Sequence, residues 1–299
     1  MSPYYMDAVC LKGDWDVVII ENSKEILEGV LVYHIRKHRG FTFIIMPLLT
    51  FYNGIHIIYP NNISLQKKRS FEKRVSQSLI NLLPKHDFYY QQYSTSYNNW
   101  MPLYWLGYKQ STRYTYKIDT RVGEQVLWNN LKNTIRRNIN KAKKISHITE
   151  VDFDRFWACI EMSFTNRSKE IPYNKEAMRN LYDEGKKHNF GKALICKSKD
   201  SDEIYSGTFV VYDANCTYYL CSFYNASYPN HGTSCYLLWH LLSKSRTPYF
   251  DFEGSMIENI EYYNRNFGGV LTPHYKIWKV NNPVLKFILK FKKLDFIDG

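Results

Sequence analysis

Apolar positions in the first third of the chain fall into short runs that are rich in β-branched and aromatic residues. Such runs, bounded by polar or glycine-containing turns, predict strands. Apolar residues recur along one face from Ser64 to Leu83, with Ser64 as a cap and Pro84 as a stop, which predicts a helix. A loop without a clear period is expected from about Tyr97 to Thr115. The strands expected in this part are residues 16–21, 29–35, 41–46, 88–93 and 114–118.

Helical periodicity governs the second half of the chain. Apolar residues at steps of three and four predict a long helix from about Glu124 to Ile145. Asp152 and Asn174 are suited to cap two more helices. After these we expect strands at 192–197, 204–213, 217–224, 249–253 and 274–280, and helices at 234–245 and 256–265.

The alternation of strands and helices at the end of the chain is typical of a βαβ unit, which makes the sheet mixed rather than purely antiparallel. A length of 299 residues is sufficient for two domains. We therefore predict an α/β fold of mixed α+β character, with domains at residues 1–118 and 119–299.

Composition and charge narrow the choice of partners. Aromatic residues make up 17% of the chain, and we expect most of them in cores and the others in binding clefts. The net charge of +12 favours anionic partners, which include RNA, acidic membranes, phosphorylated cofactors and nucleotide-linked precursors. Charge alone does not distinguish among these classes.

We expect neither a metal site nor a membrane span. The six cysteines form no CxxC pair and have no histidine cluster beside them, so we interpret them as small hydrophobes of a reduced, cytoplasmic protein. We expect no signal peptide, and no apolar run has the length of a bilayer. The basic, apolar segment Val284–Lys293 suits either a final docked helix or attachment to the inner face of the membrane.

Six cations and no acid lie between Lys132 and Lys144 in the predicted long helix. A solvated helix face explains this pattern. A phosphate-binding surface also explains it, because an all-positive stretch repels itself unless an anion screens it. Under the second interpretation Arg136, Arg137 and Lys141 bind the substrate.

The turn at residues 228–234 is the first place suited to chemistry. His231, Gly232, Thr233 and Ser234 precede an almost wholly apolar helix, whose first N–H groups and dipole favour an anion such as the pyrophosphate of coenzyme A. Gly232 would allow the backbone to approach this anion closely, and the two hydroxyl groups could donate to it. An ordinary helix cap is the alternative.

The strand that follows is the second such place. Strand alternation puts Tyr249, Asp251 and Glu253 on one face and Phe250 and Phe252 on the other. Two carboxylates beside a phenol can orient and deprotonate an incoming amine. They can equally pair with a lysine or cap the backbone.

The next helix adds two features. Ser255 and Glu258 have the spacing of a capping box. Arg265, ahead of a Gly-Gly turn, either points into the same cleft or satisfies the last helix carbonyls. The sequence carries no GxSxG, HExxH, P-loop or dinucleotide fingerprint, so nucleophilic and metal-dependent catalysis are not indicated.

Several segments together resemble the FemABX-like branch of the GNAT acyltransferases. They are Trp15 in the opening strand and residues 47–54, 131–143, 232–239, 250–255 and 267–269. The resemblance extends over nearly the whole chain and lies in the order and spacing of these segments. Two positions depart from the family pattern: Pro229 stands where GNAT proteins usually have Gln or Arg, and Asn264 where Fem-type proteins have Lys.

The resemblance implies two tandem GNAT-like domains, the first degenerate, with an acceptor cleft at or near their junction. It implies no tightly bound cofactor and a donor co-substrate that is either acyl-CoA or aminoacyl-tRNA. The anionic partner is then one of these donors or a nucleotide-linked sugar or peptide precursor.

We therefore predict an N-acyltransferase of cell-envelope or surface-polysaccharide biosynthesis, in which an acceptor amine attacks the donor directly. Asp251 or Glu253 would orient the amine or accept its proton, and backbone N–H groups would stabilise the oxyanion. The alternative is a non-catalytic RNA- or precursor-binding protein that retains the GNAT-like fold. That alternative rests on the basic helix and on the two departures from the family pattern.

Overall fold

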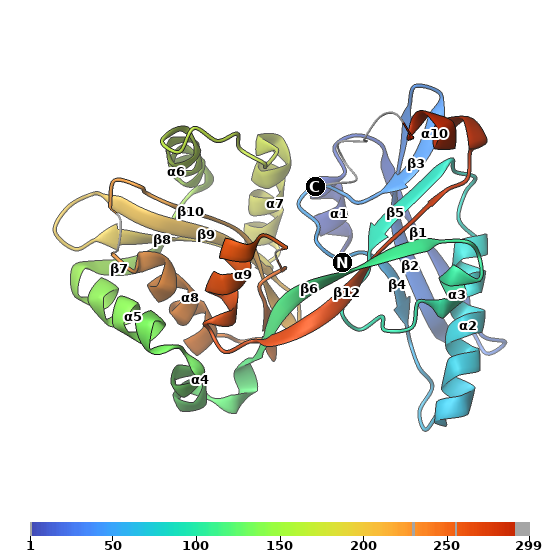
Figure 1. The fold of residues 1–299 in the computed structure, drawn as a ribbon, viewed down its shortest axis with the longest axis horizontal. Helices are drawn as coiled ribbons and strands as arrows, with labels where there is room; N and C mark the ends of the chain where they lie inside the picture. Colours follow the sequence, from blue (N-terminus) through green and yellow to red (C-terminus); the bar gives the residue numbers. More distant parts are fainter. Residues whose placement is uncertain (1, 229–230, 255, 291–299) are drawn as a thin grey trace. The chain divides into compact units, whose positions relative to one another are not determined.

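The computed structural model describes residues 2–228, 231–254 and 256–290, and the chain divides into two compact units (Figure 1). Unit 1 comprises Met1–Arg113 and Pro273–Gly299, and unit 2 comprises Tyr114–Thr272. The C-terminal segment thus groups with the first unit, unlike in the expected division at residue 118. The reason is strand β12 (Val270–Val280), which pairs with β5 (Phe88–Gln92) of unit 1.

Unit 1 contains a mixed sheet with the strand order β1-β2-β3-β5-β12, and β4 pairs with β2. Strands β3 and β5 are parallel, and the other described pairs in this unit are antiparallel. Its remaining elements are α1 (Pro3–Val9), β1 (Asp14–Glu21), β2 (Leu27–His38), β3 (Phe41–Ile45), β4 (Gly54–Ile57), α2 (Leu65–Asn81), α3 (Met101–Tyr104) and α10 (Pro283–Ile288).

Helix α2 begins where the sequence predicts. Ser64 Oγ accepts the N–H of Lys67 at 3.4 Å, which satisfies one of the free N–H groups of the first turn. The buried residues Val75 and Leu79 of α2 share a core cluster with Leu31 of β2. The apolar face of the helix therefore packs on the sheet of unit 1.

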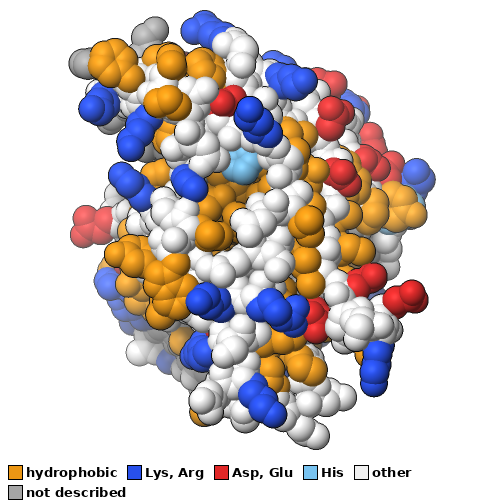
Figure 2. Space-filling view, turned by 90° about the vertical axis from the view of Figure 1, so that its right-hand side faces the viewer, with side chains coloured by type: hydrophobic (Ala, Val, Ile, Leu, Met, Phe, Trp, Pro, Cys, Tyr) orange, Lys and Arg blue, Asp and Glu red, His pale blue; other side chains and the backbone are white. Residues whose placement is uncertain are grey.

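Unit 1 differs from the prediction in its expected loop and in two elements, α1 and β4, that the sequence did not indicate, whereas its C-terminal segment agrees with the docked helix. The expected loop from Tyr97 to Thr115 contains α3, where Pro102 fits the first helical turn, and the start of β6 (Lys109–Asp119). The C-terminal segment begins as α10, whose buried Leu285 packs in an apolar cluster of this unit, and its residues 291–293 lie outside the described residues. On the face drawn in Figure 2, hydrophobic side chains reach the surface between lysine and arginine side chains.

Unit 2 contains strands in the order β6-β11-β10-β9-β8-β7. Strands β10 and β11 are parallel, so the mixed sheet predicted from the sequence is confirmed. After β6 the elements are η1 (Thr120–Val122), α4 (Glu124–Asn130), α5 (Asn133–Ile145), β7 (Ser146–Glu150), α6 (Phe153–Thr165), α7 (Lys175–Lys187), β8 (Gly191–Ser198), β9 (Ile204–Tyr212), β10 (Cys216–Tyr224), α8 (Thr233–Ser243), β11 (Tyr249–Asp251) and α9 (Glu258–Arg265).

Different helices cover the two faces of the unit 2 sheet. Successive residues of a strand point to opposite faces. In β9, Phe209 contacts Phe156 of α6 and Tyr182 of α7, whereas Val210 belongs to the core cluster that includes α5 and α8. Helices α6 and α7 therefore lie on one face, and α5 and α8 lie on the other.

One predicted helix of unit 2 is broken, while two begin where expected. Asp152 and Asn174 cap α6 and α7 by accepting backbone N–H groups at 2.9 Å. The single long helix expected after β6 is instead α4 and α5, separated by extended backbone at Leu131. Leu131 is buried in the core there, and the N–H of Lys132 donates to Asn266 O at 3.0 Å. Tertiary contacts thus override a continuous apolar stripe.

The predicted strand at 249–253 is also shorter than expected. It ends as β11 at Asp251 because Glu253 has a left-handed φ of 57°, which a strand cannot accommodate. Helix α9 begins at Glu258 with Ile257 as its N-cap, and the predicted cap residue Ser255 lies outside the described residues.

All six cysteines are free thiols. In the part of the chain that the structure describes, no helix is long and apolar enough to cross a membrane. Nor does any group of three or more His, Cys, Asp and Glu side chains among those residues have the arrangement of a metal site.

Candidate active site

Strands β10 and β11 pair in parallel, and a group of predicted site residues follows each of them in the chain. The two strands pair over only three positions, from Cys216 with Tyr249 to Tyr218 with Asp251. Beyond this point the register of β10 against β9 shifts after Tyr219, and β11 ends. Helix α8 connects the two strands. The edge outside the carboxyl ends of parallel strands is where open α/β sheets bind ligands.

Asp251 is a fully buried carboxylate at this edge. Its Oδ1 accepts a hydrogen bond from Thr115 Oγ1 at 2.6 Å and another from the backbone N–H of Glu253 at 2.8 Å. Thr115 belongs to β6, which pairs antiparallel with β11. The two bonds fix the turn that carries Glu253, so the geometry of Asp251 suits a residue that positions its neighbour.

Glu253 is the candidate general base. The residue is half-buried, its carboxyl group is enclosed by protein, and its backbone has a φ of 57°. Left-handed backbone is costly for a residue with a Cβ, and such strain is characteristic of functional sites. Burial raises the pKa of Glu253 well above its ordinary value of 4.5, and the charge of Asp251 adds to the shift. A carboxylate with a raised pKa accepts protons more readily at neutral pH.

Three further side chains lie close enough to Glu253 for its charge to affect their pKa values, and the sequence pattern did not indicate them. They are Tyr173, Cys216 and Cys221. Burial raises the pKa of all three, and that of Cys221 reaches about 12, so these three neighbours of Glu253 are uncharged at neutral pH. Tyr173 lies in the loop between α6 and α7, where no periodicity could have indicated it. Alternation along β10 would put Cys216 and Cys221, which are five residues apart, on opposite faces of the sheet. The shift in register between Tyr219 and Cys221 interrupts that alternation, so both cysteines lie near Glu253.

The start of α8 is the candidate anion site. The first helical hydrogen bond runs from Tyr236 N–H to Gly232 O at 3.1 Å, so the N–H groups of residues 233–235 precede it. Thr233 is buried and Ser234 is half-buried in this first turn. Gly232 is the N-cap, and no side-chain hydrogen bond caps the helix among the described residues. The N-terminal start of α8 thus retains the N–H donors and the helix dipole that favour binding of a phosphate.

Gly232 serves a packing role that the sequence did not indicate. Its φ is +71°, and a Cβ built on it would lie 2.4 Å from the backbone oxygen of Asn138 in α5. The close approach predicted for this glycine is therefore an approach to helix α5. Asn138 lies between the predicted substrate-binding residues Arg137 and Lys141, which brings the basic helix against the start of α8.

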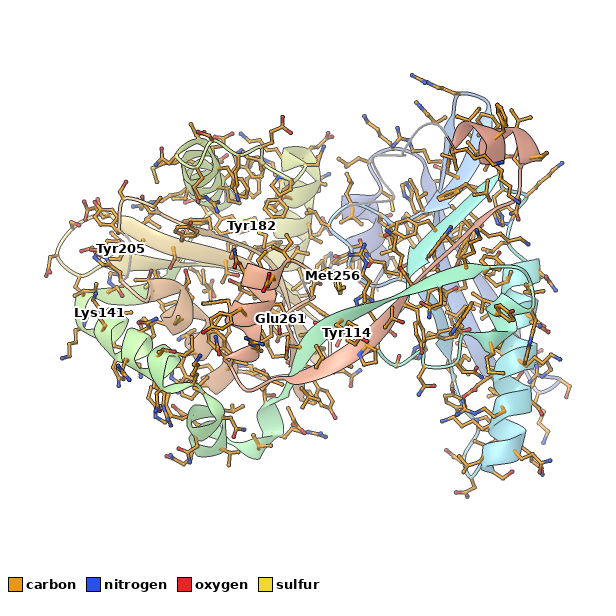
Figure 3. All side chains as sticks on the ribbon, viewed as in Figure 1. Tyr114, Lys141, Tyr182, Tyr205, Met256 and Glu261 are labelled. Carbon is orange, nitrogen blue, oxygen red and sulfur yellow. The ribbon has the colours of Figure 1, made fainter. Side chains whose placement is uncertain are left out.

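The cations of α5 divide between two sides of the helix. Arg137 and Lys141 are exposed and four residues apart, so they share one side. Arg136 is half-buried and donates to Asn133 Oδ1. Figure 3 shows Lys141 on α5 and Tyr205 on β9 at the same end of unit 2. Both cations of this pair are exposed to solvent on one side of α5.

His231 packs among aromatic rings beside the start of α8. Its ring centroid lies 4.9 Å from that of Tyr205 and 5.6 Å from that of Tyr228. Its Nδ1 atom is buried and has no hydrogen-bond partner among the described residues. The ring packing makes His231 a support for this turn, and the bare Nδ1 leaves one polar atom for a ligand or water.

The remaining predicted residues, Tyr249 and Arg265, have their described contacts elsewhere. The hydroxyl of Tyr249 accepts a hydrogen bond from Arg121 at 2.8 Å, at the end of β11 away from Glu253. Arg265 lies 3.8 Å from the carboxylate of Glu261 and over the ring of Tyr262. Both therefore have structural partners, and neither has a described contact with Asp251 or Glu253.

Together these features define a chemistry. The candidate anion site at the start of α8 follows β10 along the chain, and the candidate proton acceptor Glu253 follows β11, which pairs in parallel with β10. This arrangement suits the transfer of a group from a phosphate-bearing donor to an acceptor that loses a proton.

Comparison with known families agrees with this geometry. Residues 129–253 match the family model described as an acetyltransferase (GNAT) domain. The chain carries a GNAT acyltransferase domain. The match includes the basic helix, the start of α8 and Glu253, and it lies wholly within unit 2. No curated protein matches the chain in sequence.

Solved structures extend the likeness to nearly the whole chain. FemX has a TM-score of 0.71 at 12% identity, over 96% of this chain and 93% of its own. A C-terminal domain assigned to a lysylphosphatidylglycerol synthetase from Agrobacterium fabrum has a TM-score of 0.53 at 8% identity, over 92% and 86%. A tandem GNAT protein from the clavulanic acid biosynthesis pathway has a TM-score of 0.50 at 9% identity, over 89% and 82%. The GNAT domain is thus set in a tandem GNAT fold, and the resemblance to the FemABX-like branch is confirmed at the level of the fold.

Proposed function

We propose that unit 2 transfers an acyl or aminoacyl group to an amine acceptor by direct attack, with Glu253 as the general base. The observation that carries the proposal is the enclosed carboxyl group of Glu253, which has a raised pKa and is held on a strained turn by Asp251. Unit 1 is then the degenerate GNAT-like partner. The family match of residues 129–253, which lie in unit 2, supports the placement of the transfer reaction in that unit.

In the proposed reaction the acceptor nitrogen forms a bond to the carbonyl carbon of the donor. The proton from the nitrogen passes to the Glu253 carboxylate, directly or through a water molecule. The bond from the carbonyl carbon to the thioester sulfur or the ester oxygen then breaks, and the leaving group takes up a proton. No covalent bond to the protein forms, and Asp251 acts by positioning and by raising the pKa of its neighbour.

The donor is proposed to bind through its phosphates at the start of α8, near Arg137 and Lys141. An acyl-CoA fits the GNAT domain type, whereas an aminoacyl-tRNA fits the likeness to FemX. The acceptor is proposed to be a precursor of the cell envelope or of a surface polysaccharide, met at the cytoplasmic face of the membrane. The names of FemX and of the lysylphosphatidylglycerol synthetase domain support this class.

Transfer assays with the variant Glu253→Gln test the proposal. Removal of the base should lower kcat/KM by about 10²- to 10⁴-fold while donor binding is kept. The matched control is Glu258→Gln, an exposed glutamate at the start of α9, which should retain full activity. Full activity of Glu253→Gln with both donor classes would refute the assignment.

Melting temperatures measured with CoA and with aminoacyl-tRNA distinguish the two donor classes. A ligand that binds the folded state raises the melting temperature, and the stabilisation grows with the logarithm of its concentration relative to Kd. Stabilisation by CoA favours the acyl-CoA route, and stabilisation by aminoacyl-tRNA alone favours the other. The alternative function, an RNA- or precursor-binding protein without catalysis, predicts binding that collapses with salt and no transfer with any donor.

A further inference from the structure

Helix α3 and the residue after it present a patch of large apolar side chains in unit 1. Met101, Tyr104 and Trp105 are 53%, 61% and 52% exposed. The opposite side of the helix is anchored, since Leu103 is buried and Pro102 O accepts a hydrogen bond from Gln77 of α2 at 3.4 Å. The exposure is therefore a property of a fixed helix and not of a loose end.

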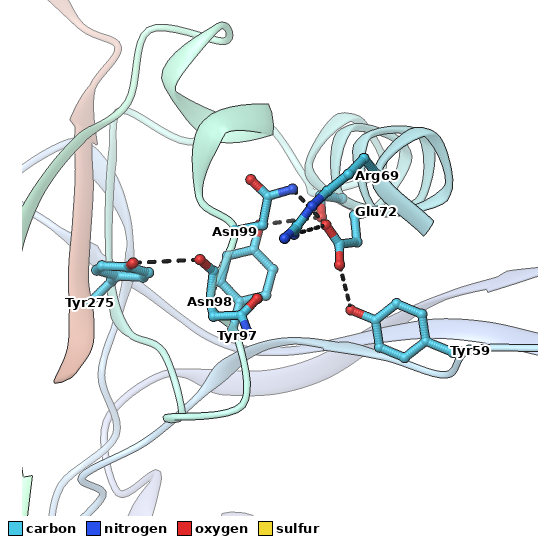
Figure 4. Close-up of polar contacts among 8 residues, drawn as sticks. Tyr59, Arg69, Glu72, Tyr97, Asn98, Asn99 and Tyr275 are labelled. Atoms are coloured by element: carbon cyan, nitrogen blue, oxygen red, sulfur yellow. Dashed lines mark hydrogen bonds and ion pairs between the residues drawn. The ribbon is translucent and has the colours of Figure 1, made fainter. Parts of the chain in front are cut away.

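Cations lie beside this patch. Lys73 Nζ is 5.0 Å from the centroid of the Trp105 ring, and α2 carries five Lys and Arg residues in total. The only acid in α2 is Glu72, which is buried and accepts hydrogen bonds from Tyr59, Arg69 and Asn99 (Figure 4). The outward charge of α2 thus comes from its cations. We call Lys73, Met101, Tyr104 and Trp105 the α3 surface.

Two kinds of macromolecular partner fit the α3 surface less well than a membrane does. Bases of single-stranded RNA stack on open ring faces, but on this surface Lys73 already lies over the ring of Trp105. A second copy of the chain would bring two cationic surfaces together. An anionic bilayer suits both the apolar and the cationic side chains of the α3 surface. Trp and Tyr lie at the headgroup level, Met enters the acyl boundary and Lys contacts lipid phosphates.

We propose that the α3 surface docks unit 1 on an anionic lipid membrane. This docking rests on the proposed function in one respect, that the acceptor is met at the cytoplasmic face of the membrane. It does not depend on the transfer chemistry. Each lysine or arginine near such a membrane is attracted to the lipid phosphates. The attraction should therefore weaken with salt, whereas the apolar part should not.

Vesicle co-sedimentation of the full chain tests the proposal. Vesicles that contain phosphatidylglycerol should bind the protein more tightly than phosphatidylcholine vesicles. The triple variant Met101→Ser, Tyr104→Ser, Trp105→Ser should bind at least tenfold more weakly. Lys73→Glu, which leaves the apolar patch intact, should weaken binding to phosphatidylglycerol alone and serves if the triple variant fails to fold.

The matched control changes an exposed apolar pair on an acidic strand of the same unit. Val17 and Ile19 of β1 are 40% and 46% exposed, and β1 also carries Asp14, Asp16 and Glu21. Val17→Thr with Ile19→Thr keeps the β-branched shape and should bind vesicles as the unmodified protein does. Equal loss in this control and in the triple variant would overturn the proposal.

Other outcomes also overturn it. One is equal binding of the protein to both lipid compositions. Another is unchanged vesicle binding in both α3 variants. A third is that the α3 variants lose RNA binding or self-association while their vesicle binding stays intact. Transfer to a water-soluble acceptor, measured in the same variants, should be unchanged. If vesicle binding depends on the α3 surface but no transfer occurs in any protein, the proposed chemistry fails and the docking surface stands.

Discussion

At the scale of single residues, the pair Asp251 and Glu253 shows how one environment gives two carboxylates different tasks. Asp251 accepts two hydrogen bonds, from Thr115 and from the backbone N–H of Glu253, and places its charge beside Glu253. Glu253 is enclosed next to that charge, and its pKa is raised. Two neighbouring carboxyl groups in different environments are candidates for separate acid–base roles.

Removal of the Asp251 charge should shift the pH dependence of transfer. A general base is active when deprotonated, so the rate should rise as pH passes through the raised pKa of Glu253. Asp251→Asn removes a charge that raises this pKa, and the rising limb should move to lower pH. The measurement is kcat/KM against pH. An unshifted limb in a variant with unchanged thermal stability would show that Asp251 does not tune Glu253.

Glu253 should also make stability depend on pH. Its folded-state pKa is raised above the ordinary 4.5, so the stability tied to its protonated form is fully present below about 4.5 and is lost as pH rises toward the raised value. Glu253→Gln cannot ionise. The free energy of unfolding of this variant, relative to the unmodified protein, should therefore increase with pH above 4.5. Urea unfolding at several pH values measures this, and parallel curves for the two proteins would contradict it.

At the scale of elements, the contact between α5 and α8 depends on one glycine. Gly232→Ala should lower the free energy of unfolding by about 2 kcal/mol or more, because left-handed backbone alone costs about 1–2 kcal/mol and the new Cβ meets the Asn138 backbone. Gly40→Ala is the control, since Gly40 also has a positive φ, of 80°, but no neighbour within 4 Å. Equal losses of stability in the two variants would remove the packing argument.

The break between α4 and α5 is the clearest failure of the sequence pattern at this scale. A continuous apolar stripe from Leu127 through Leu131 to Ile135 predicts one helix, and all three residues are indeed buried. The stripe survives the break because Leu131 turns into the core from extended backbone. Periodicity reports which residues are buried, whereas helix continuity depends on partners such as Asn266, which are distant in sequence.

At the scale of the whole molecule, the charge of +12 should act through specific cations. If the donor is a tRNA, Arg137→Gln with Lys141→Gln should lower the slope of log affinity against log salt by up to about 2, since each lost phosphate contact removes about 1. Lys186→Gln with Lys187→Gln, at the end of α7 on the other face of the sheet, is the charge-matched control. Binding measured from low to moderate salt tests this, and equal slopes in both variants would indicate attraction by net charge alone.

The sequence by itself indicated most of the strands and helices, the caps at Ser64, Asp152 and Asn174, and the mixed character of the sheets, because these follow from local periodicity and local hydrogen bonds. It also marked Glu253 and the start of α8 as candidates. It did not indicate α1, α3, β4, β7 or the break between α4 and α5. The tertiary structure alone placed Thr115 on Asp251, Tyr173 near Glu253 and Gly232 against Asn138. It also grouped the C-terminal strand with unit 1. These contacts join residues far apart in the chain, and no spacing along one sequence encodes them.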